Sequence, residues 1–297
     1  MRSVRVRVPA SSANLGPGFD TLGLALALHD EIEVETAAAG LVVEVSGEGA
    51  GQVPVDDTHL VVRAMNAAWD VLGGRPAGLR LRCRNRIPHS RGLGSSAAAA
   101  VAGAVAAAAL ADCDVIGERD ALLQLTAGLE GHADNAAASL LGGLVVAWEA
   151  SGNTARRFDA VRLDAHPGIA PVALIAKAES STAMTRGLLP AHVPLADAAF
   201  TGSRTALAVL AFTARPELLM PATEDRLHQS YRRPAYPESA DLVDALRHHG
   251  IPAAISGAGP TVLAFTRDGR LPDGLDLSGF TPCPLAVDGE GVYVETG

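Results

Sequence analysis

Glycine and serine residues gather at one point of the sequence where they could bind phosphate. Residues 87–111, IPHSRGLGSSAAAAVAGAVAAAALA, place Gly92 and Gly94, then Ser95 and Ser96, directly before an alanine-rich apolar run. A helix that begins at such a loop presents unpaired backbone N–H groups and the positive end of its dipole. Both attract anions, and serine hydroxyls can add contacts to phosphate or to a metal ion. The loop is therefore a candidate site for a nucleotide phosphate.

Common phosphate-binding motifs do not decide between this interpretation and a simpler one. The GLGSS segment lacks the Gly-Lys-Ser/Thr ending of a Walker A loop, and it has no G-x-G-x-x-G pattern. The same residues could do no more than cap a helix, with Ser95 or Ser96 as the capping residue. From the loop alone, both interpretations stay open.

The overall composition argues against several other kinds of protein. Of the 297 residues, 48% are hydrophobic and only 4% are aromatic, which predicts a core built largely from Ala, Val and Leu. A formal net charge of −9 argues against a nucleic-acid surface, because such a surface needs clustered Lys and Arg. Cys83, Cys113 and Cys283 are widely separated, so neither a disulfide nor a structural zinc site is expected.

Membrane and secretory segments are not expected either. The N-terminus, MRSVRVRVPASSANLG, has the alternation of a strand and no apolar signal-peptide region. The longest apolar run, residues 97–111, is shorter than the roughly 20 residues of a membrane span. We therefore expect a soluble cytoplasmic protein without a membrane partner.

Alternating apolar and charged residues predict three strands, at residues 4–8, 31–35 and 79–86. Arginines occupy the charged positions of the first and third segments, and glutamates occupy those of the second. Antiparallel pairing of these strands would place opposite charges side by side on the solvent face.

Helical periodicity and stop signals predict most of the remaining elements. Helices are expected at residues 58–72 (capped by Thr58), 95–111, 120–130, 135–141, 182–189, 195–213 and 237–249, with further strands after residue 142, at 172–177 and twice within 251–265. This mixed order predicts an α+β fold, not a doubly wound sheet. A polar, turn-rich segment at residues 150–157 predicts two domains, 1–152 and 153–297.

Three separate segments resemble the signature motifs of one enzyme family, the GHMP small-molecule kinases. They are PASSANLGPGFDTLGLAL (the first motif segment, residues 9–26), PHSRGLGSSAA (the phosphate loop, residues 88–98) and SGAGPTVLAF (the third motif segment, residues 256–265). Within that family the match to the homoserine kinases is close. EGHADN, STAMTRGLLP and EDRLHQSYR, from residues 130, 181 and 224, extend the resemblance over nearly the whole chain.

The resemblance implies a fold, an activity and a nucleotide site. The fold would be two-domain α+β, with an N-terminal half like domain 2 of ribosomal protein S5 and a ferredoxin-like C-terminal half. ATP would give its γ-phosphoryl group to the side-chain hydroxyl of L-homoserine, a step toward threonine. The residues implied in wrapping the triphosphate are Pro88, His89, Ser90, Arg91, Gly92, Leu93, Gly94, Ser95, Ser96, Ala97 and Ala98.

The resemblance also implies residues for the amino-acid head group, since homoserine carries a carboxylate and an ammonium. Arg186 and Arg232 match carboxylate-binding arginines, and Asp20 matches the residue near the ammonium. The polar residues implied around the reacting hydroxyl are Asn14, His132 and Asn135, with Gly257 and Gly259 bringing backbone close to the substrate. Taken singly, each could instead be a turn, surface or structural residue.

A strong general base is not obligatory, because phosphoryl transfer relies on positioning and charge neutralisation. We expect Asn135 to orient the hydroxyl beside His132, with Asp134 as a less favoured candidate base. The resemblance implies that Ser95 or Ser96 helps to hold Mg²⁺. The family usually places an acidic ligand on the helix before the histidine, but Gly128 and Gln124, one and two turns before His132, are not acidic. Either Glu130 is the acidic ligand, or serine, water and phosphate hold the ion.

Two other functions remain open on the sequence. The protein could phosphorylate a different small alcohol, although Arg186, Arg232 and Asp20 suit an amino-acid head group. It could also be a catalytically silent protein that binds a nucleotide or an amino acid on the same fold. A homodimer is a further expectation.

Overall fold

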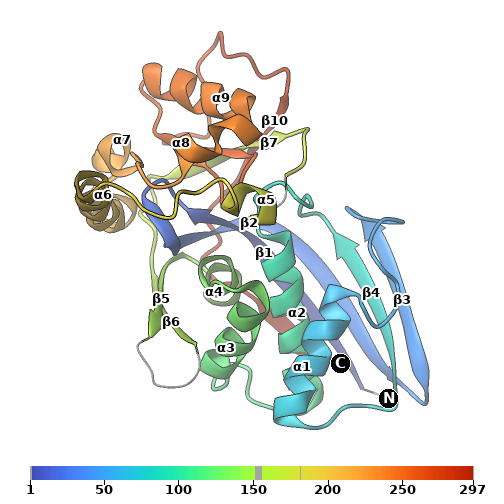
Figure 1. The fold of residues 1–297 in the computed structure, drawn as a ribbon. Coiled ribbons are helices and arrows are strands. Elements are labelled where there is room, and N and C mark those ends of the chain that lie inside the picture. The colour runs from blue at the N-terminus through green and yellow to red at the C-terminus, as the bar shows by residue number, and fades with distance from the viewer. Residues whose placement is uncertain (1, 151–155, 181, 297) are drawn as a thin grey trace.

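A computed structural model describes residues 2–150, 156–180 and 182–296. Its first half is built on a seven-stranded sheet, and Figure 1 shows how the helices are arranged around it. The strand order is β11-β1-β2-β4-β3, and β5 pairs with both β2 and β6. All pairs are antiparallel except β3 with β4. The strands are β1 (Ser3–Asn14), β2 (Gly18–Ala37), β3 (Gly40–Gly47), β4 (Gly78–Asn85), β5 (Leu144–Ala150), β6 (Arg157–Leu163) and β11 (Tyr293–Thr296).

The alternating pattern of β1, β2 and β4 has the predicted consequence for charge. Val4, Val6 and Val8 of β1 point into the core, while the intervening side chains face solvent. Glu33 of β2 lies opposite Arg5 of β1 and Arg82 of β4 in the register, and it forms ion pairs with both, at 3.1 and 3.4 Å. The predicted antiparallel pairing of opposite charges is confirmed.

Four helices pack together against this sheet (Figure 1): α1 (Leu60–Leu72), α2 (Ser95–Leu110), α3 (Arg119–Glu130) and α4 (Asp134–Leu141). Alanines fill α2 because its neighbours leave little room: nearly every residue from Ala97 to Leu110 is buried. A Cβ atom on Gly103 would lie 2.4 Å from the backbone oxygen of Val61 in α1. Small side chains thus let α2 occupy the centre of the helical layer.

Two predicted helix caps are wrong. The first helix begins at Leu60, and the hydroxyl of Thr58 donates a hydrogen bond to Asp56 Oδ1 at 2.6 Å instead of capping it. The N-cap of α2 is Gly94, in the left-handed conformation with φ 70°, and within the described residues no side chain caps this helix. Ser96 donates its hydroxyl to Glu130 of α3, a partner that local sequence does not indicate.

The second half is built on a four-stranded antiparallel sheet of order β10-β7-β9-β8, with β7 (Ala170–Ala176), β8 (Ala253–Ile255), β9 (Val262–Thr266) and β10 (Phe280–Pro284). Its helices are α5 (Thr182–Arg186), α6 (Leu195–Thr213), α7 (Leu219–Ala222), α8 (Gln229–Arg232), α9 (Pro237–His248) and the 3-10 turns η1 (Pro216–Leu218) and η2 (Arg233–Ala235). The fifth helix is shorter than the predicted 182–189. The predicted α+β class is confirmed.

The predicted boundary after residue 152 lies outside the described residues and stays a prediction. The strands on either side of it, β5 and β6, pair with each other in the seven-stranded sheet, and β11 joins the same sheet beside β1. One core cluster contains Leu22 and Val101 from the first half together with Phe212 and Phe265 from the second. Among the described helices, none combines the length and apolar character that crossing a bilayer requires.

Candidate active site

Four carbonyl groups of the phosphate loop are bound by other parts of the chain. The carbonyl oxygens of Ser90, Arg91, Gly92 and Leu93 accept hydrogen bonds from Ser180 N, Thr261 N, Ser256 Oγ and Ser11 N, at 2.9, 3.3, 2.6 and 3.1 Å. Within the described chain, the backbone N–H groups of residues 92–96 donate no hydrogen bond. The loop therefore presents these N–H groups, and the N-terminus of α2, as donors for an anion.

The glycines of this loop are required by contacts between the motif segments. A Cβ on Gly92 would lie 2.3 Å from Ser256 O of the third motif segment, and a Cβ on Gly94 would lie 2.1 Å from Ser11 Oγ of the first. Both glycines also have positive φ, 77° and 70°. We expected them to bring backbone close to a ligand, and the structure adds this packing role, which the sequence did not indicate.

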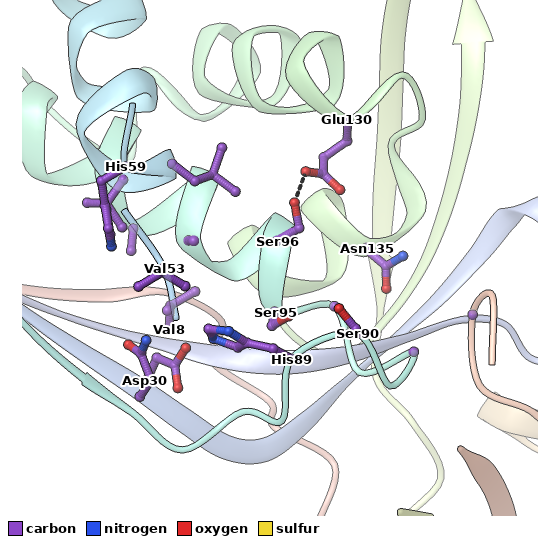
Figure 2. A pocket seen from close by; sticks show the side chains of 18 of the residues that line it. Val8, Asp30, Val53, His59, His89, Ser90, Ser95, Ser96, Glu130 and Asn135 are labelled. Atoms are coloured by element: carbon purple, nitrogen blue, oxygen red, sulfur yellow. Dashed lines mark hydrogen bonds between the residues drawn. The ribbon is translucent and has the colours of Figure 1, made fainter. Parts of the chain in front are cut away.

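A cavity of about 430 Å³ opens beside the loop. Figure 2 shows Ser90, Ser95, Ser96, Glu130 and Asn135 at one end and Asp30, Val53, His59 and His89 at the other. The cavity is thus polar where the free N–H groups lie and partly apolar farther away. His59 is buried and its Nδ1 atom has no hydrogen-bond partner among the described residues.

The structure separates the predicted phosphate-loop residues into two groups. His89, Ser90, Gly92, Gly94, Ser95 and Ser96 line the cavity. Leu93, Ala97 and Ala98 are buried in the core, and neither Pro88 nor Arg91 lines the cavity. The Arg91 guanidinium instead donates to Ala176 O at 2.9 Å, His89 O at 2.8 Å and Lys177 O at 3.3 Å, so it connects the loop to the end of β7.

A serine hydroxyl and a glutamate carboxylate meet at the polar end of the cavity. Ser96 Oγ donates to Glu130 Oε1 at 2.5 Å, and both residues line the cavity (Figure 2). Gln124, one of the two positions where an acidic residue was missing, pairs with the backbone of Phe158 in β6 and does not line the cavity. Glu130 is accordingly the acidic side chain of α3 at this site.

His132, Asp134 and Asn135 form a compact polar group at the start of α4. His132 Nδ1 lies 2.8 Å from Asp134 Oδ1, which also accepts the backbone N–H of Asn135 at 2.7 Å. Ser11 Oγ donates to the side-chain oxygen of Asn135 at 3.1 Å. Asp134 is 2% exposed, whereas His132 and Asn135 line the cavity.

The bond to Asp134 controls the charge of His132. This hydrogen bond, supported by the negative charges of Asp20 and Glu130, raises the pKa of the imidazole above its ordinary value against the opposing effect of burial. The imidazolium form is therefore more stable than in an isolated histidine, and its Nδ1–H is bound to the carboxylate. A histidine in this state can donate a hydrogen bond from Nε2 but cannot accept a proton there.

The predicted head-group residues lie together on β2, α5 and α8. Asp20 and Arg186 form a two-bond ion pair at 2.8 and 2.9 Å, and this bond to Asp20 raises the pKa of the guanidinium. The guanidinium carbons of Arg186 and Arg232 each lie 5.4 Å from the centre of the Phe19 ring. Arg232 is only 2% exposed, and burial lowers the pKa of its guanidinium.

Asn14 connects this cluster to the cavity wall. Its Nδ2 donates to Gly257 O at 2.8 Å, and its Oδ1 accepts the backbone N–H of Asp20 at 3.1 Å. Arg232 Nη1 reaches the same Gly257 oxygen at 3.5 Å. Gly257 and Gly259 both line the cavity, although Asn14, Asp20 and the two arginines do not.

Sequence reasoning missed one residue in this cluster, His228. Its side chain is fully buried, and it contacts both Arg232 and the backbone of the first motif segment. The residue stands in the EDRLHQSYR segment that resembles the family, but a histidine four residues before an arginine carries no signal of its own. Its partners come from distant parts of the chain.

Family models and similar known proteins point to the same family. Residues 59–143 match the family model for the GHMP kinases N terminal domain, and residues 207–274 match the model for the GHMP kinases C terminal. A homoserine kinase of Rhodococcus erythropolis is 56% identical, with 90% of this chain and 87% of that protein covered. A homoserine kinase of Streptomyces coelicolor is 52% identical, with 96% of each covered.

Solved structures agree with the fold. The crystal structure of homoserine kinase from Cytophaga hutchinsonii superposes with a TM-score of 0.83 at 24% identity, covering 99% of this chain and 97% of that one. A putative homoserine kinase from Listeria monocytogenes gives a TM-score of 0.74 at 31% identity, covering 98% and 99%. The chain has the two-domain GHMP kinase fold, and it belongs to the homoserine kinases of the GHMP kinase family.

Proposed function

We propose that the protein is an ATP-dependent kinase that phosphorylates the side-chain hydroxyl of L-homoserine. The hydroxyl oxygen forms a bond to the γ-phosphorus of ATP, the bond from that phosphorus to the bridging oxygen breaks, and the products are O-phospho-L-homoserine, ADP and a proton. The activity named for relatives more than half identical over most of the chain supports this proposal.

One structural observation carries the proposal furthest. The phosphate loop, with its free N–H groups, and the Asp20–Arg186–Arg232 cluster are joined through the third motif segment, because Gly92, Asn14 and Arg232 all contact residues 256–257. A triphosphate and an amino-acid head group bound at these two places would lie on either side of His132 and Asn135. This arrangement favours an amino-acid acceptor over an isoprenoid or sugar alcohol, which has no zwitterionic head group.

The Asp20–Arg186 pair would recognise that head group by exchanging partners. Both side chains are partly exposed, 36% and 43%, so a ligand can reach them. A zwitterion inserted between them would place its carboxylate against Arg186 and its ammonium against Asp20, which keeps opposite charges adjacent throughout. Arg232 would add a second guanidinium from the buried side.

The reacting hydroxyl would be oriented by hydrogen bonds and would not be deprotonated by a strong base. Asp134 is buried and engaged by His132 and by the backbone of Asn135, which supports a structural role over that of a base. Asn135, held through its oxygen by Ser11, can donate from its amide nitrogen to the hydroxyl. The His132 imidazolium would stabilise negative charge on the phosphoryl oxygens.

Ser96 and Glu130 have the donor atoms that Mg²⁺ prefers, and we propose that they hold it, with Ser95 adjacent. Among the described residues no group of three His, Cys, Asp or Glu side chains is placed to hold a metal ion, so phosphate oxygens and water would complete the coordination. The ion would neutralise charge on the phosphates when bound.

Glu130→Gln and Ser96→Ala should each raise the Mg²⁺ concentration needed for half-maximal activity, whereas Asp120→Asn on the same helix as Glu130 should not.

Phosphorus NMR of the reaction mixture tests the proposed reaction itself. The purified protein with Mg-ATP and L-homoserine should yield one new phosphate monoester signal in a one-to-one ratio with ADP, and carbon NMR should place the ester on the side-chain carbon. Formation of inorganic phosphate without an ester would contradict the proposal.

The cytoplasmic location and the homodimer stay predictions.

A further inference from the structure

A buried histidine without an assigned role, His228, lies between the turn that precedes β2 and the helix α8. His228 immediately precedes α8, which ends with Arg232, and its side chain is fully buried. Its ring centroid lies 5.3 Å from that of Phe19, the ring over which Arg186 and Arg232 both sit. The histidine thus contacts the cluster from within the protein interior.

The two partners of His228 define its protonation state. Nε2 lies 2.7 Å from the backbone oxygen of Gly16, which can only accept, so Nε2 carries a hydrogen. Nδ1 lies 3.3 Å from Arg232 Nη1, which can only donate, so Nδ1 must offer its lone pair. The contacts therefore specify a neutral imidazole with the proton on Nε2.

The groups around the ring agree with a neutral histidine. Asp225, also fully buried, has Oδ2 3.7 Å from Nε2, but this carboxylate accepts the backbone N–H groups of Leu227, His228 and Gln229. Burial, helped by the positive charge of Arg232, lowers the pKa of His228 despite the negative charges of Asp225 and Asp20. Protonation would remove the acceptor for Arg232 and place two cations in contact.

The two bonds of His228 link two parts of the chain that are distant in sequence. Gly16 belongs to the turn between β1 and β2, shortly before Phe19 and Asp20 of β2, and Arg232 belongs to α8. The Arg232 guanidinium has three acceptors at similar distances, His228 Nδ1 at 3.3 Å, Thr185 O at 3.3 Å and Gly257 O at 3.5 Å. His228 therefore contributes to the direction of this guanidinium.

We propose that His228 is a positioning residue for carboxylate recognition, which holds the Arg232 guanidinium and the Gly16 turn in the arrangement that binds the α-carboxylate of the substrate. This inference rests on the proposed function, because it assigns the carboxylate to Arg232. It predicts that His228 affects a ligand only if that ligand carries a carboxylate.

NMR titrations in the presence of Mg-ADP would test this for two ligands, L-homoserine and 3-aminopropan-1-ol, which is homoserine without its carboxylate. His228→Leu removes both hydrogen bonds, and His228→Gln keeps one donor and one acceptor. We expect His228→Leu to weaken homoserine binding by about tenfold or more, as loss of a hydrogen bond to a charged group does. His228→Gln should restore most of the affinity, and His192→Leu, an exposed control, should change nothing.

The alcohol without the carboxylate separates positioning from general damage. Its affinity should be the same in the wild type and in His228→Leu. Equal weakening of both ligands, or unchanged homoserine binding in His228→Leu, would overturn the inference. If the leucine variant does not fold, His228→Asn takes its place: its amide reaches the position of Nδ1 but not that of Nε2, so the bond to Gly16 O is lost, and homoserine binding equal to that of the glutamine variant would overturn the inference.

Binding is measured apart from turnover so that the two proposals can fail separately. A wild type that binds homoserine but releases no ADP would contradict the proposed function, while the variants would still decide the role of His228. A wild type that does not bind homoserine would contradict both.

Discussion

Each charged side chain in the candidate substrate site already has a protein partner. Asp20 pairs with Arg186, His132 with Asp134, and Arg232 with His228, at distances between 2.8 and 3.3 Å. Such pairing fixes the rotamers of groups that would otherwise lose entropy when a ligand binds. The partly exposed Asp20–Arg186 pair is the one that a ligand can exchange with, since the partners of the other two are buried.

Replacing Asp20 by Asn tests the proposed ammonium site. The amide keeps the size of the carboxylate but loses its charge, so the KM for L-homoserine should rise by about tenfold or more, and the KM for ATP should stay near the wild-type value. Asp273→Asn, at an exposed position, is the matched control. Steady-state kinetics with each substrate varied would check this, and an equal rise in both KM values would argue against a head-group role.

The His132–Asp134 pair predicts a pH dependence of stability. The pKa of His132 is raised in the folded protein, so the pair stabilises the fold fully below the unfolded pKa of about 6.5, and this contribution is lost as pH rises through the folded pKa. Asp134→Asn removes the negative charge that raises the pKa of His132. The loss of Tm in this variant should be larger at pH 6 than at pH 9, and a pH-independent loss in thermal melts would contradict the assignment.

Backbone contacts between elements determine where α2 and the phosphate loop can lie. The loop is held by the first and third motif segments and by the guanidinium of Arg91, and α2 is held against α1 at Gly103. Apart from Arg91, these contacts are made by backbone atoms and small side chains. The alanine-rich composition of α2 therefore serves the close approach of helices around the site.

Two glycine substitutions in helices should have opposite effects on stability. Gly103→Ala would place a Cβ 2.4 Å from Val61 O, so we expect a loss of about 1–3 kcal/mol in the free energy of unfolding through overpacking. Gly202→Ala in α6 meets nothing within 4 Å and should gain up to about 1 kcal/mol from helix propensity. Chemical denaturation would measure both, and a stabilised Gly103→Ala would show that the helices are not in close contact.

The sequence predicted elements better than it predicted their partners. The strands β1, β2 and β4 and the helices α2, α6 and α9 follow from local alternation, periodicity and stop signals. The helices and β4 lie within a few residues of their predicted bounds, whereas β1 continues to Asn14 and β2 begins at Gly18, well beyond the predicted 4–8 and 31–35. Thr58 and Ser95 or Ser96 were wrongly predicted as caps because the bonds of Thr58 and Ser96 lead elsewhere. The placement of Arg91 and His228 depends on partners 85 and 212 residues away, which no local pattern encodes.

At the scale of the whole molecule, the two halves share structure. The last strand, β11, pairs with the first, β1, and β6 extends the seven-stranded sheet beyond the expected boundary (Figure 1). The principal core cluster takes residues from both halves, although α9 and the four-stranded sheet add a smaller cluster of their own. The candidate site lies where the motif segments of the two halves meet.

This continuity predicts that the chain unfolds as one unit. Calorimetry should show a single cooperative transition, with Mg-ADP raising the Tm of the whole molecule because binding stabilises only the folded state. Two resolved transitions, of which only one shifts with the nucleotide, would show that the halves are energetically independent.

The central claim is that the protein phosphorylates homoserine, and ADP release tests it most directly. The purified protein with Mg-ATP should be compared on L-homoserine, L-threonine, L-serine and mevalonate. We predict rapid ADP release with homoserine alone, and its loss at the same homoserine concentration in Arg186→Ala. No turnover on any of the four, or turnover on homoserine that does not depend on Arg186, would contradict the account.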